Sequence, residues 1–504
     1  SAGKAESMHF IGIEIEPALV RVVVVDIESA AVVASAVAAC GEVAGLPDGF
    51  AEVDPGLWLR GIDEAMREVG GVLGERKADV AAVGVTAVDG GMVVMDGADR
   101  VVRPAKLGWD RSARRQVEAI SRAFGGAPGV IEMIGNPPDA GWMAAQLLWL
   151  KEHEPAHYRL AARVLTVQDF VGYWLTGESG TTGSSAATTG LFAVPERAWC
   201  RELVEFIDPA AAAMLPPGLL PTVPRGCLRA GLAEAWGLDP RVRVAPGLSR
   251  RAAVLLAAGA ARPGDVAAEL AVEGALTAVT AEPCVDFQGE GAVGCDAAGL
   301  GFTRMGLRNV VAAPEMVRRH YGWSAAEFER AISSAPLGAD GLLFLPYLRG
   351  EDVPRLPEGC GVLHGMNLNN FTPGNLARAA AEGVALGFGY AMSRLRDIGI
   401  EAREIRVTRE VGPTGAAMLS DVCGVPVVAV AGAGGAAMGA AMQAAAVFFH
   451  DKGEEVGFDE IAGYLVVADE ATRRQPDPQR QEQYEAMLAR QQYLVETLHG
   501  EGFI

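Results

Sequence analysis

The stretch HFIGIEIEPALVRVVVVDIESAAVVASAVAA, residues 9–39, decides the class of fold. It holds three apolar segments separated by two short polar breaks, at residues 14–17 and 26–29. Apolar segments of this length, rich in Val and Ile and divided by brief turns, are typical of β-strands. We therefore expect three consecutive antiparallel strands at the start of the chain.

The next segments predict a helix and a fourth strand. Four apolar residues between positions 55 and 73 recur at roughly the period of a helix: Leu57, Ile62, Met66 and Val69. The continuous apolar run VAAVGVTAV, residues 80–88, is typical of a strand that is covered on both faces. Strands that alternate with a helix favour an α/β fold.

A second hairpin in the middle of the chain echoes the first. Residues 264–283, GDVAAELAVEGALTAVTAEP, read as a strand, a tight turn and a strand. A chain of 504 residues also exceeds what one hydrophobic core usually supports. We therefore predict two hairpin-led α/β domains, at residues 8–245 and 246–504.

The last third of the chain is rich in small residues. NLARAAAEGVALGFGYAMSRLRDIG, residues 375–399, predicts a long helix, and EIRVT, residues 404–408, predicts a strand. The polar segment DEATRRQPDPQRQEQ, residues 469–483, is expected to be a disordered linker into a terminal helix.

Composition excludes several classes of partner. The net charge of −20 argues against nucleic acid and against anionic membranes, which require a basic surface. The seven cysteines form no C-x-x-C pair, so we expect reduced thiols in a cytoplasmic protein. No histidine stands at a metal-ligand spacing, and no metal site is predicted. The longest apolar run, Ala252 to Ala261, is too short to cross a bilayer.

Six segments carry a family resemblance, in sequence and in their order along the chain. They are VAAVGVTAVDGGMVVMDGADRVVRPAKLGWDR (80–111), GNPPDAGWMAAQLLWLKEHEP (135–155), QDFVGYWLTGE (168–178), GLLFLPYLRGEDVP (341–354), NLARAAAEGVALG (375–387) and GAAMGAAM (435–442). From about Phe10 to the terminal helix, the chain resembles the FGGY family of carbohydrate kinases, especially its xylulokinase branch. The resemblance implies two actin-like (ribonuclease-H-like) ATPase domains, with sugar and ATP meeting in the interdomain cleft.

The chain departs from that family at the positions that the resemblance assigns to phosphate and magnesium. The family's Asp-x-Gly-Thr-Thr in the first hairpin is replaced here by Glu14, Ile15, Glu16, Pro17 and Ala18. Its Gly-Thr-Ser in the second hairpin is replaced by Ala271, Val272 and Glu273. Carboxylates, and a proline without an N–H, thus stand where amides and hydroxyls would face phosphate.

The Gly-rich nucleotide turn expected after EIRVT is also changed, because Arg409 and Glu410 stand there. Two unit charges about 4 Å apart interact by roughly 4 kcal/mol at an intermediate dielectric, so Glu16, Glu273 and Glu410 would repel a triphosphate. We expect Arg250, Arg251 and Arg409 to pair with these three glutamates and to fill the nucleotide site. The alternative is that these arginines are exposed charges on separate loops.

Ser249 occupies the position that the resemblance assigns to the catalytic aspartate. A serine hydroxyl cannot take a proton from a sugar alcohol at neutral pH unless another base activates it. No replacement base is visible near it in the sequence, so Ser249 is predicted to be catalytically inactive.

The sugar side of the family pattern is partly kept. Asp110 and Arg111 match a substrate-binding segment, although Gly108 and Trp109 stand where a Trp and a polar residue are expected. Asp89 lies in the segment where the family offers a Met-His pair to the substrate. Asp110, Arg111 and Asp89 are therefore candidate substrate contacts; the alternative for Asp110 is a helix cap.

These departures favour a pseudokinase, which keeps the fold and a site for a small sugar or polyol but not ATP-dependent phosphoryl transfer. The resemblance implies assembly as a homodimer or with an active paralogue. The alternative is an active pentulose-like kinase that uses ATP and Mg²⁺ through relocated residues, with Glu14 holding the metal. A third hypothesis is different chemistry in the same cleft, with Glu16, Glu273 and Arg250 as acid, base and anion clamp.

Overall fold

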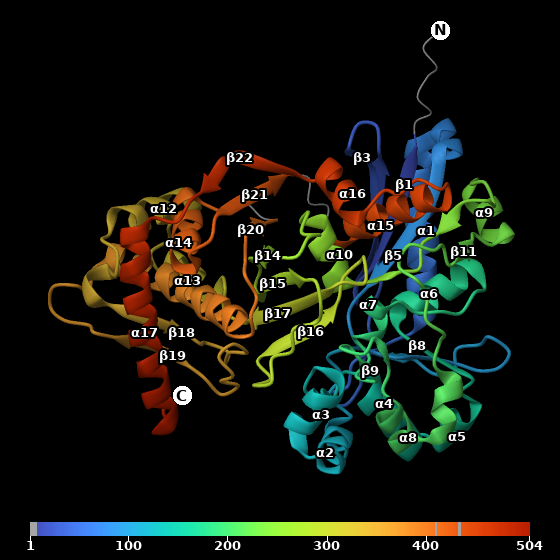
Figure 1. Ribbon diagram of the computed structural model, residues 1–504, viewed down its shortest axis with the longest axis horizontal. Coiled ribbons are helices and arrows are strands. Elements are labelled where there is room, and N and C mark those ends of the chain that lie inside the picture. The colour runs from blue at the N-terminus through green and yellow to red at the C-terminus, as the bar shows by residue number, and fades with distance from the viewer. Residues whose placement is uncertain (1–7, 409–410, 432–434) are drawn as a thin grey trace, which may run out of the picture.

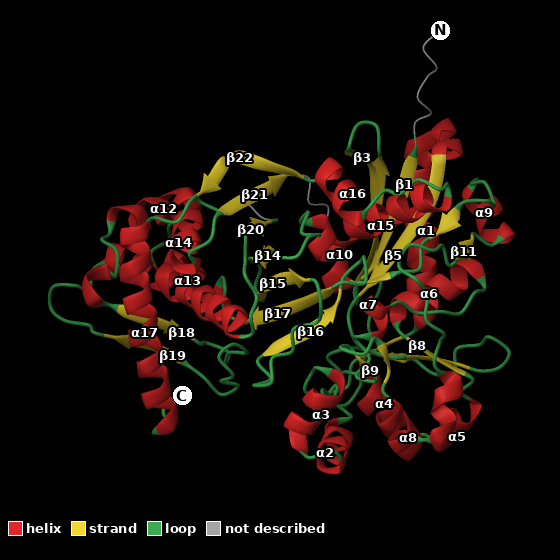
Figure 2. Ribbon diagram, in the orientation of Figure 1, coloured by secondary structure: helices red, strands yellow, loops and turns green. Residues whose placement is uncertain are grey.

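The computed structural model describes residues 8–408, 411–431 and 435–504. Two mixed β-sheets of seven strands each form the cores of two halves, and helices flank both sheets (Figures 1 and 2). The predicted α/β class is confirmed. None of the described helices is both long enough and apolar enough to span a membrane.

The first sheet has the strand order β11-β12-β5-β1-β2-β3, and β13 pairs with β5 beside β12. Its strands are β1 (His9–Ile15), β2 (Leu19–Asp26), β3 (Ala31–Ala39), β5 (Val80–Ala87), β11 (Gly226–Cys227), β12 (Arg243–Val244) and β13 (Leu248–Ser249). Its helices are α1 (Pro55–Leu73), α6 (Val167–Thr176), α9 (Ala230–Trp236), α10 (Arg250–Ala257), α15 (Gly435–Asp451) and α16 (Phe458–Leu465), with the 3-10 helix η1 (Gly74–Asp79).

The three antiparallel strands, the helix at 55–73 and the buried strand after it are confirmed. Every residue of β1 is buried, because α1 packs on one face of the sheet and α15 on the other. A Cβ on Gly12 would lie 1.8 Å from the carbonyl oxygen of Ala437, and one on Gly84 would lie 1.9 Å from that of Ala440. Glycines in the strands and alanines in α15 therefore allow helix and sheet to meet backbone to backbone.

A lobe of short elements is inserted between β5 and β11. Its helices are α2 (Arg114–Ala123), α3 (Gly126–Ile134), α4 (Met143–His153), α5 (Pro155–Leu160), α7 (Gly183–Ala186), α8 (Arg201–Ile207) and η2 (Pro209–Met214). Its strands are β6 (Val93–Met95), β7 (Ala105–Lys106), β8 (Arg163–Leu165), β9 (Phe192–Ala193) and β10 (Ala198–Trp199), and β7 pairs with β4 (Glu52–Val53).

The second sheet has the order β16-β17-β15-β14-β20-β21-β22. Its strands are β14 (Asp265–Glu269), β15 (Gly274–Thr280), β16 (Gly291–Cys295), β17 (Gly301–Leu307), β20 (Glu404–Val407), β21 (Val427–Ala431) and β22 (Val467–Arg474). Around it lie α11 (Ala312–His320), α12 (Ala325–Ser334), η3 (Ala339–Gly341), α13 (Pro373–Asp397), α14 (Pro413–Cys423), α17 (Pro478–Gly500) and the hairpin of β18 (Leu343–Pro346) and β19 (Gly361–His364). The predicted second hairpin is confirmed as β14 and β15.

The expectation of a disordered linker at residues 469–483 is wrong. Most of its first half lies in β22, an edge strand that pairs antiparallel with β21, and its second half enters α17. The polar composition suggested disorder. Pairing with strand β21, however, supplies hydrogen-bond partners for the backbone that the segment cannot supply by itself.

The boundary predicted between residues 245 and 246 stays a prediction. Strand β13 and helix α10 follow that boundary in the chain but pack with the first sheet. Helix α15, near the end of the chain, also lies on the first sheet (Figure 1). Strand β13 and helices α10 and α15 therefore belong to the second half of the sequence but pack with the first sheet.

Candidate functional site

A cavity of about 400 Å³ lies between the two halves. The first half contributes Asp89, Arg111, Asn136, Asp139, Trp142, Thr188 and Arg251 to its lining, and the second half contributes Glu290, Arg304, Arg308, Glu351, Asp352 and Arg355. We call this cavity the cleft. Its walls are charged in both signs, which suits a polar ligand.

Asp89 lies in the cleft, two residues after the end of β5. Its Oδ1 accepts a hydrogen bond from the backbone N–H of Arg250 at 2.9 Å, and its Oδ2 lies 3.2 Å from Nε of Arg251. The carboxylate therefore connects the end of β5 to the start of α10. The role of Asp89 in substrate binding stays a prediction.

Three glycines meet beneath Asp89. A Cβ on Gly141 would lie 1.6 Å from the carbonyl oxygen of Gly108, and a Cβ on Gly108 would lie 2.3 Å from that of Asp89. Gly90, at φ +76°, lies against both. A side chain at position 108 would therefore collide with the backbone of Asp89. Trp142 supplies an aromatic ring to the cleft instead.

Asp110 does not line the cleft. It is fully buried, accepts hydrogen bonds from the backbone N–H of Ala51 at 2.8 Å and of Ser112 at 3.0 Å, and also binds the Ser112 hydroxyl. Its neighbour Arg111 does line the cleft and pairs with Asp139 at 3.1 Å. Of the two matched residues, only Arg111 is thus in a position to reach a ligand.

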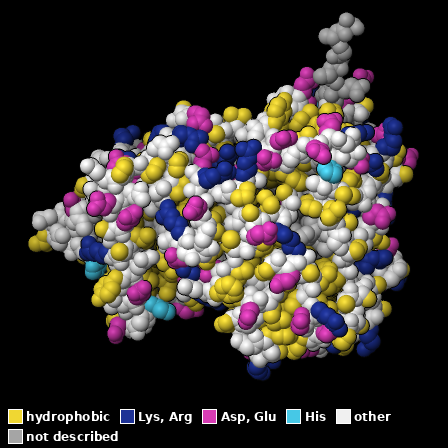
Figure 3. All heavy atoms as spheres, in the orientation of Figure 1, with side chains coloured by type: hydrophobic (Ala, Val, Ile, Leu, Met, Phe, Trp, Pro, Cys, Tyr) yellow, Lys and Arg dark blue, Asp and Glu magenta, His cyan; other side chains and the backbone are white. Residues whose placement is uncertain are grey.

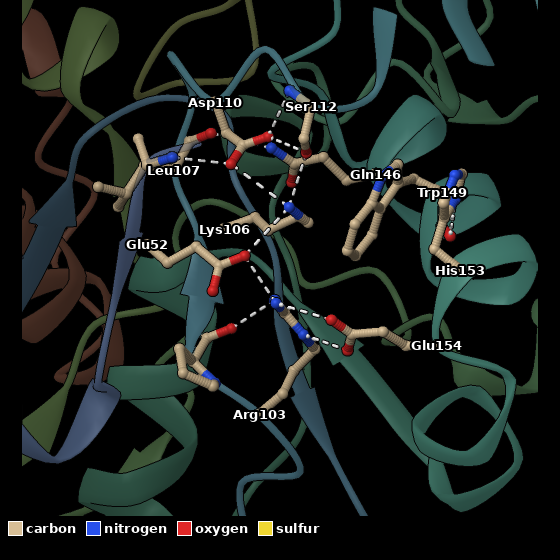
Figure 4. Close-up of polar contacts among 12 residues, drawn as sticks. Glu52, Arg103, Lys106, Leu107, Asp110, Ser112, Gln146, Trp149, His153 and Glu154 are labelled. Carbon is tan, nitrogen blue, oxygen red and sulfur yellow. Dashed lines mark hydrogen bonds and ion pairs between the residues drawn. The ribbon is translucent and has the colours of Figure 1, made fainter. Parts of the chain in front are cut away.

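Asp110 belongs to a set of charged residues that sequence reasoning missed, drawn in Figure 4. We call Glu52, Arg103, Lys106, Asp110 and Glu154 the buried network. Lys106 has no exposed surface; its Nζ lies 3.1 Å from Glu52, 3.3 Å from Asp110 and 3.9 Å from the ring centre of Trp149. Arg103 binds Glu52 at 2.6 Å and Glu154 at 2.8 Å. Every charge in this set therefore has a close partner of opposite sign.

Ser249 is buried at the N-cap of α10. Its Oγ accepts a hydrogen bond from the backbone N–H of Ala252 and lies 2.9 Å from Oγ of Ser184, which also accepts from the backbone N–H of Ser249. Ser249 is not among the residues that line the cleft. Two serine hydroxyls therefore meet here. Ser184 and Ser249 are 65 residues apart in the sequence, so the sequence alone did not indicate that they are neighbours.

Arg250, directly after Ser249, lies between the two hairpins. Its Nε is 3.7 Å from Glu14 at the end of β1, and its Nη1 is 3.9 Å from Glu269 at the end of β14. Arg304 on β17 approaches the other oxygen of Glu269 at 3.7 Å. We call Arg251 and Arg304, which both line the cleft, the cleft arginines. The ends of strands β1 and β14 thus both approach Arg250.

The expected pairing of Arg250 and Arg251 with Glu16 or Glu273 is wrong. Within the described residues, Arg250 and Arg251 form ion pairs with Glu14, Glu269 and Asp89, and with neither Glu16 nor Glu273. Ala271, Val272 and Glu273 form the exposed bend between β14 and β15. Arg409 and Glu410 lie outside the described residues, so their predicted roles stay predictions.

Glu14 is nearly inaccessible to solvent. Burial is the largest cause that raises its pKa above the ordinary 4.5, and the nearby Glu16 raises that pKa further. Arg250, Arg21 and the backbone N–H of Ala437 act in the opposite direction. Its carboxylate is therefore engaged by the protein from several sides.

A second cavity, of about 510 Å³, lies within the second half. It is mostly apolar, and its lining includes Leu270, Val310, Phe328, Val384, Val411 and Gly412. Gly412 lies just beyond the turn after β20, where the resemblance implied a nucleotide turn. Thr414 at the start of α14 donates its backbone N–H to Glu329 at 2.9 Å.

Metal ligands are not gathered in the described part of the chain. Among residues 8–408, 411–431 and 435–504, no three His, Cys, Asp or Glu side chains are grouped so that they could hold a metal ion.

Comparison with known proteins places the chain in a family. Residues 9–257 match the model of the N-terminal domain of the FGGY family of carbohydrate kinases, and residues 303–448 match that of its C-terminal domain. The chain is similar to a xylulose kinase of Streptomyces coelicolor, at 31% identity over 75% of each chain, and to one of Haemophilus influenzae, at 26% identity over 79% of this chain and 82% of that one. It is also similar to the crystal structure of a xylulose kinase from Rhodospirillum rubrum, with a TM-score of 0.86 and 26% identity over 98% of this chain and 99% of that one. With the actin-like two-domain fold that the sequence predicted, this chain belongs to the FGGY family of carbohydrate kinases.

Proposed function

We propose that this protein binds a small polyhydroxylated ligand in the cleft and does not transfer phosphate from ATP. The observation that carries the proposal is the pairing of Arg250 with both Glu14 and Glu269. These carboxylates end the first strand of each hairpin, next to the turns that the family uses for phosphate. Ion pairs within the protein beside these turns support the proposal that phosphate is not bound there.

The residues present do not fit a triphosphate with magnesium. Pro17 has no N–H to donate, and Glu14 is buried and shared between Arg21 and Arg250. Glu16 adds a further carboxylate at the same turn. Since each carboxylate near a phosphate costs electrostatic energy, this turn disfavours the binding of ATP.

The catalytic position supports the same proposal. The Oγ of Ser249 is hydrogen-bonded to Ser184 and to the backbone of α10, and among the described residues no carboxylate or imidazole forms a hydrogen bond with it. A hydroxyl with these partners has no base to activate it.

The active kinase is a second candidate, and the comparisons favour it because the relatives are named xylulose kinases. Two observations support it. The carboxylate of Asp89 faces the cleft close to the start of α10, where a relocated base would act. The apolar cavity beside Val411 and Gly412 has room for a heterocyclic base.

An assay of ADP release with a panel of pentuloses, hexoses and polyols separates the two candidates. We expect no release above the sugar-free rate, for the natural chain and also for Ser249→Asp, because the phosphate turns stay unchanged in that variant. Sugar-dependent release that Asp89→Asn abolishes would establish the second candidate. Release that appears only in Ser249→Asp would show that the turns still bind ATP.

Assembly as a homodimer or with an active paralogue, a cytoplasmic location, and the absence of nucleic-acid or membrane partners belong to the same proposal. Charged side chains of both signs are interspersed on the face shown in Figure 3. Light scattering of the purified protein, alone and mixed with an active paralogue, tests the assembly.

A further inference from the structure

Two arginines reach the cleft from opposite halves of the molecule. Arg251 comes from α10, and Arg304 comes from β17. In the described part of the chain each forms a single ion pair, Arg251 with Asp89 at 3.2 Å and Arg304 with Glu269 at 3.7 Å. Their side chains are 31% and 23% exposed, so both are accessible from the cleft.

A guanidinium carries five N–H donors. A single ion pair at 3.7 Å is longer than a hydrogen bond, so most donors of Arg304 are available to a ligand. By contrast, Arg308 in the same cleft holds Asp352 at 2.6 Å, and its charge is engaged.

Arg251 and Arg304 are also close enough to repel each other. Burial is the largest cause that lowers the pKa of Arg304, and the charge of Arg251 lowers that pKa further. The charges of three carboxylates raise that pKa instead: Glu269, Asp89 and Asp352. The two guanidiniums repel each other in a partly desolvated space, and the three carboxylates offset part of this repulsion. An anion between the guanidiniums would offset more of it and supply an acceptor to both.

The rest of the cleft suits a polyol. Trp142 offers an aromatic face for C–H groups, and the carboxylates of Asp139 and Asp352 can accept hydrogen bonds from hydroxyls. A volume of about 400 Å³ is in the range of sites for small ligands.

We propose that the cleft selects polyols that carry a negatively charged group, a carboxylate or a phosphate, and that Arg251 and Arg304 bind this group between them. The inference rests on the proposed function, since it names the class of ligand for the same cleft. It concerns binding only and requires no phosphoryl transfer.

Calorimetric titration of the full chain at fixed ionic strength tests this proposal with three ligands of one carbon skeleton: xylitol, xylonate and xylitol phosphate. We expect at least one anionic ligand to bind roughly tenfold to a hundredfold more tightly than xylitol, as hydrogen bonds to charged groups imply. Comparison of xylonate with xylitol phosphate shows which anion the arginines accept.

Variants of Arg251 and Arg304 test whether these two residues cause the preference for an anionic ligand. Arg304→Gln and Arg251→Gln should each reduce the preference for the anion roughly tenfold or more, and Arg304→Lys should retain part of it. Arg241→Gln is the matched control, because it removes the same charge from an exposed pair with Asp239 outside the cleft. Circular dichroism verifies that each variant is folded.

The outcomes separate this inference from the proposed function. Equal affinity for all three ligands, or a preference for the anion that survives in Arg304→Gln and in Arg251→Gln, would overturn the inference and leave polyol binding intact. Absence of binding by all three would overturn both. Transfer of phosphate from ATP would overturn the proposed function without affecting the selectivity for anions.

Discussion

The buried network and the cleft arginines both pair cations with carboxylates, yet their charges are satisfied to different degrees. In the buried network, Arg103 lies 2.6 Å and 2.8 Å from two carboxylates, and Lys106 lies 3.1 Å and 3.3 Å from two carboxylates and 2.7 Å from the Ser112 hydroxyl (Figure 4). The cleft arginines, by contrast, each pair with a single carboxylate among the described residues, Arg251 at 3.2 Å and Arg304 at 3.7 Å. Close, fully partnered charges hold a fold together, whereas loosely partnered charges beside a cavity remain available for a ligand.

The largest effect is expected from Lys106→Met. Removal of the ammonium leaves Glu52 and Asp110 buried with one partner fewer, so the free energy of unfolding should fall by about 3–5 kcal/mol. Urea denaturation measures it. Arg201→Gln, which breaks an exposed pair with Glu205, should leave the free energy of unfolding unchanged. If both variants behave alike, the buried network does not hold the fold together.

Gly141→Ala should have the next largest effect. The added methyl group would lie 1.6 Å from the carbonyl oxygen of Gly108, so the backbone under Asp89 must move, at a cost of about 1–3 kcal/mol. Thermal unfolding measures the loss. Gly231→Ala, where no atom lies within 4 Å of the added Cβ, is the control. If Gly141→Ala is as stable as the natural chain, the close contacts between the glycines do not constrain the backbone of the cleft.

Glu14→Gln should raise stability at neutral pH. Because the pKa of Glu14 is raised in the folded state, its contribution to stability is present below pH 4.5 and is lost as the pH rises through the folded pKa. The side-chain amide of Gln stays uncharged, so the variant does not lose this contribution. Its free energy of unfolding at pH 7 should therefore exceed that of the natural chain, by less than the change in Lys106→Met. Unfolding curves in a pH series that starts below 4.5, the ordinary pKa, and extends to neutral pH test the sign. A lower stability of Glu14→Gln at pH 7 would mean that its ion pairs outweigh its burial.

Arg304→Gln should have the smallest effect on the empty protein. It removes one weak ion pair and the repulsion from Arg251, so the free energy of unfolding should change by less than about 1 kcal/mol. Lys106→Met deletes a fully buried cation and Arg304→Gln deletes a partly buried one, so their losses of stability can be compared directly. A loss as large as that of Lys106→Met would make Arg304 a structural residue.

Local pattern was sufficient to predict much of the fold. The strands within residues 9–39 and the helix at 55–73 were predictable because apolar periodicity is set by neighbours in the chain. Strand β22 was not, because its charged sequence becomes a strand only through pairing with β21.

The site was predictable in place but not in detail. The sequence indicated that charges gather at the hairpin ends, yet it named Glu16 and Glu273 where Glu14 and Glu269 face Arg250. Which carboxylate of a turn points inward depends on the pleat and the bend, and spacing along the chain does not determine these. The partners of Ser249 and Lys106 are likewise brought together by tertiary packing.

Calorimetric titration of the protein with magnesium-ATP, up to millimolar concentration, tests most directly whether the phosphate site has been replaced by ion pairs. We expect no saturable, magnesium-dependent heat and no thermal stabilisation, because Arg250 is already paired with both Glu14 and Glu269 and because these carboxylates would repel a triphosphate. Saturable binding that requires both the triphosphate and magnesium would contradict this replacement and would identify the protein as an active nucleotide-dependent kinase whose base has yet to be found.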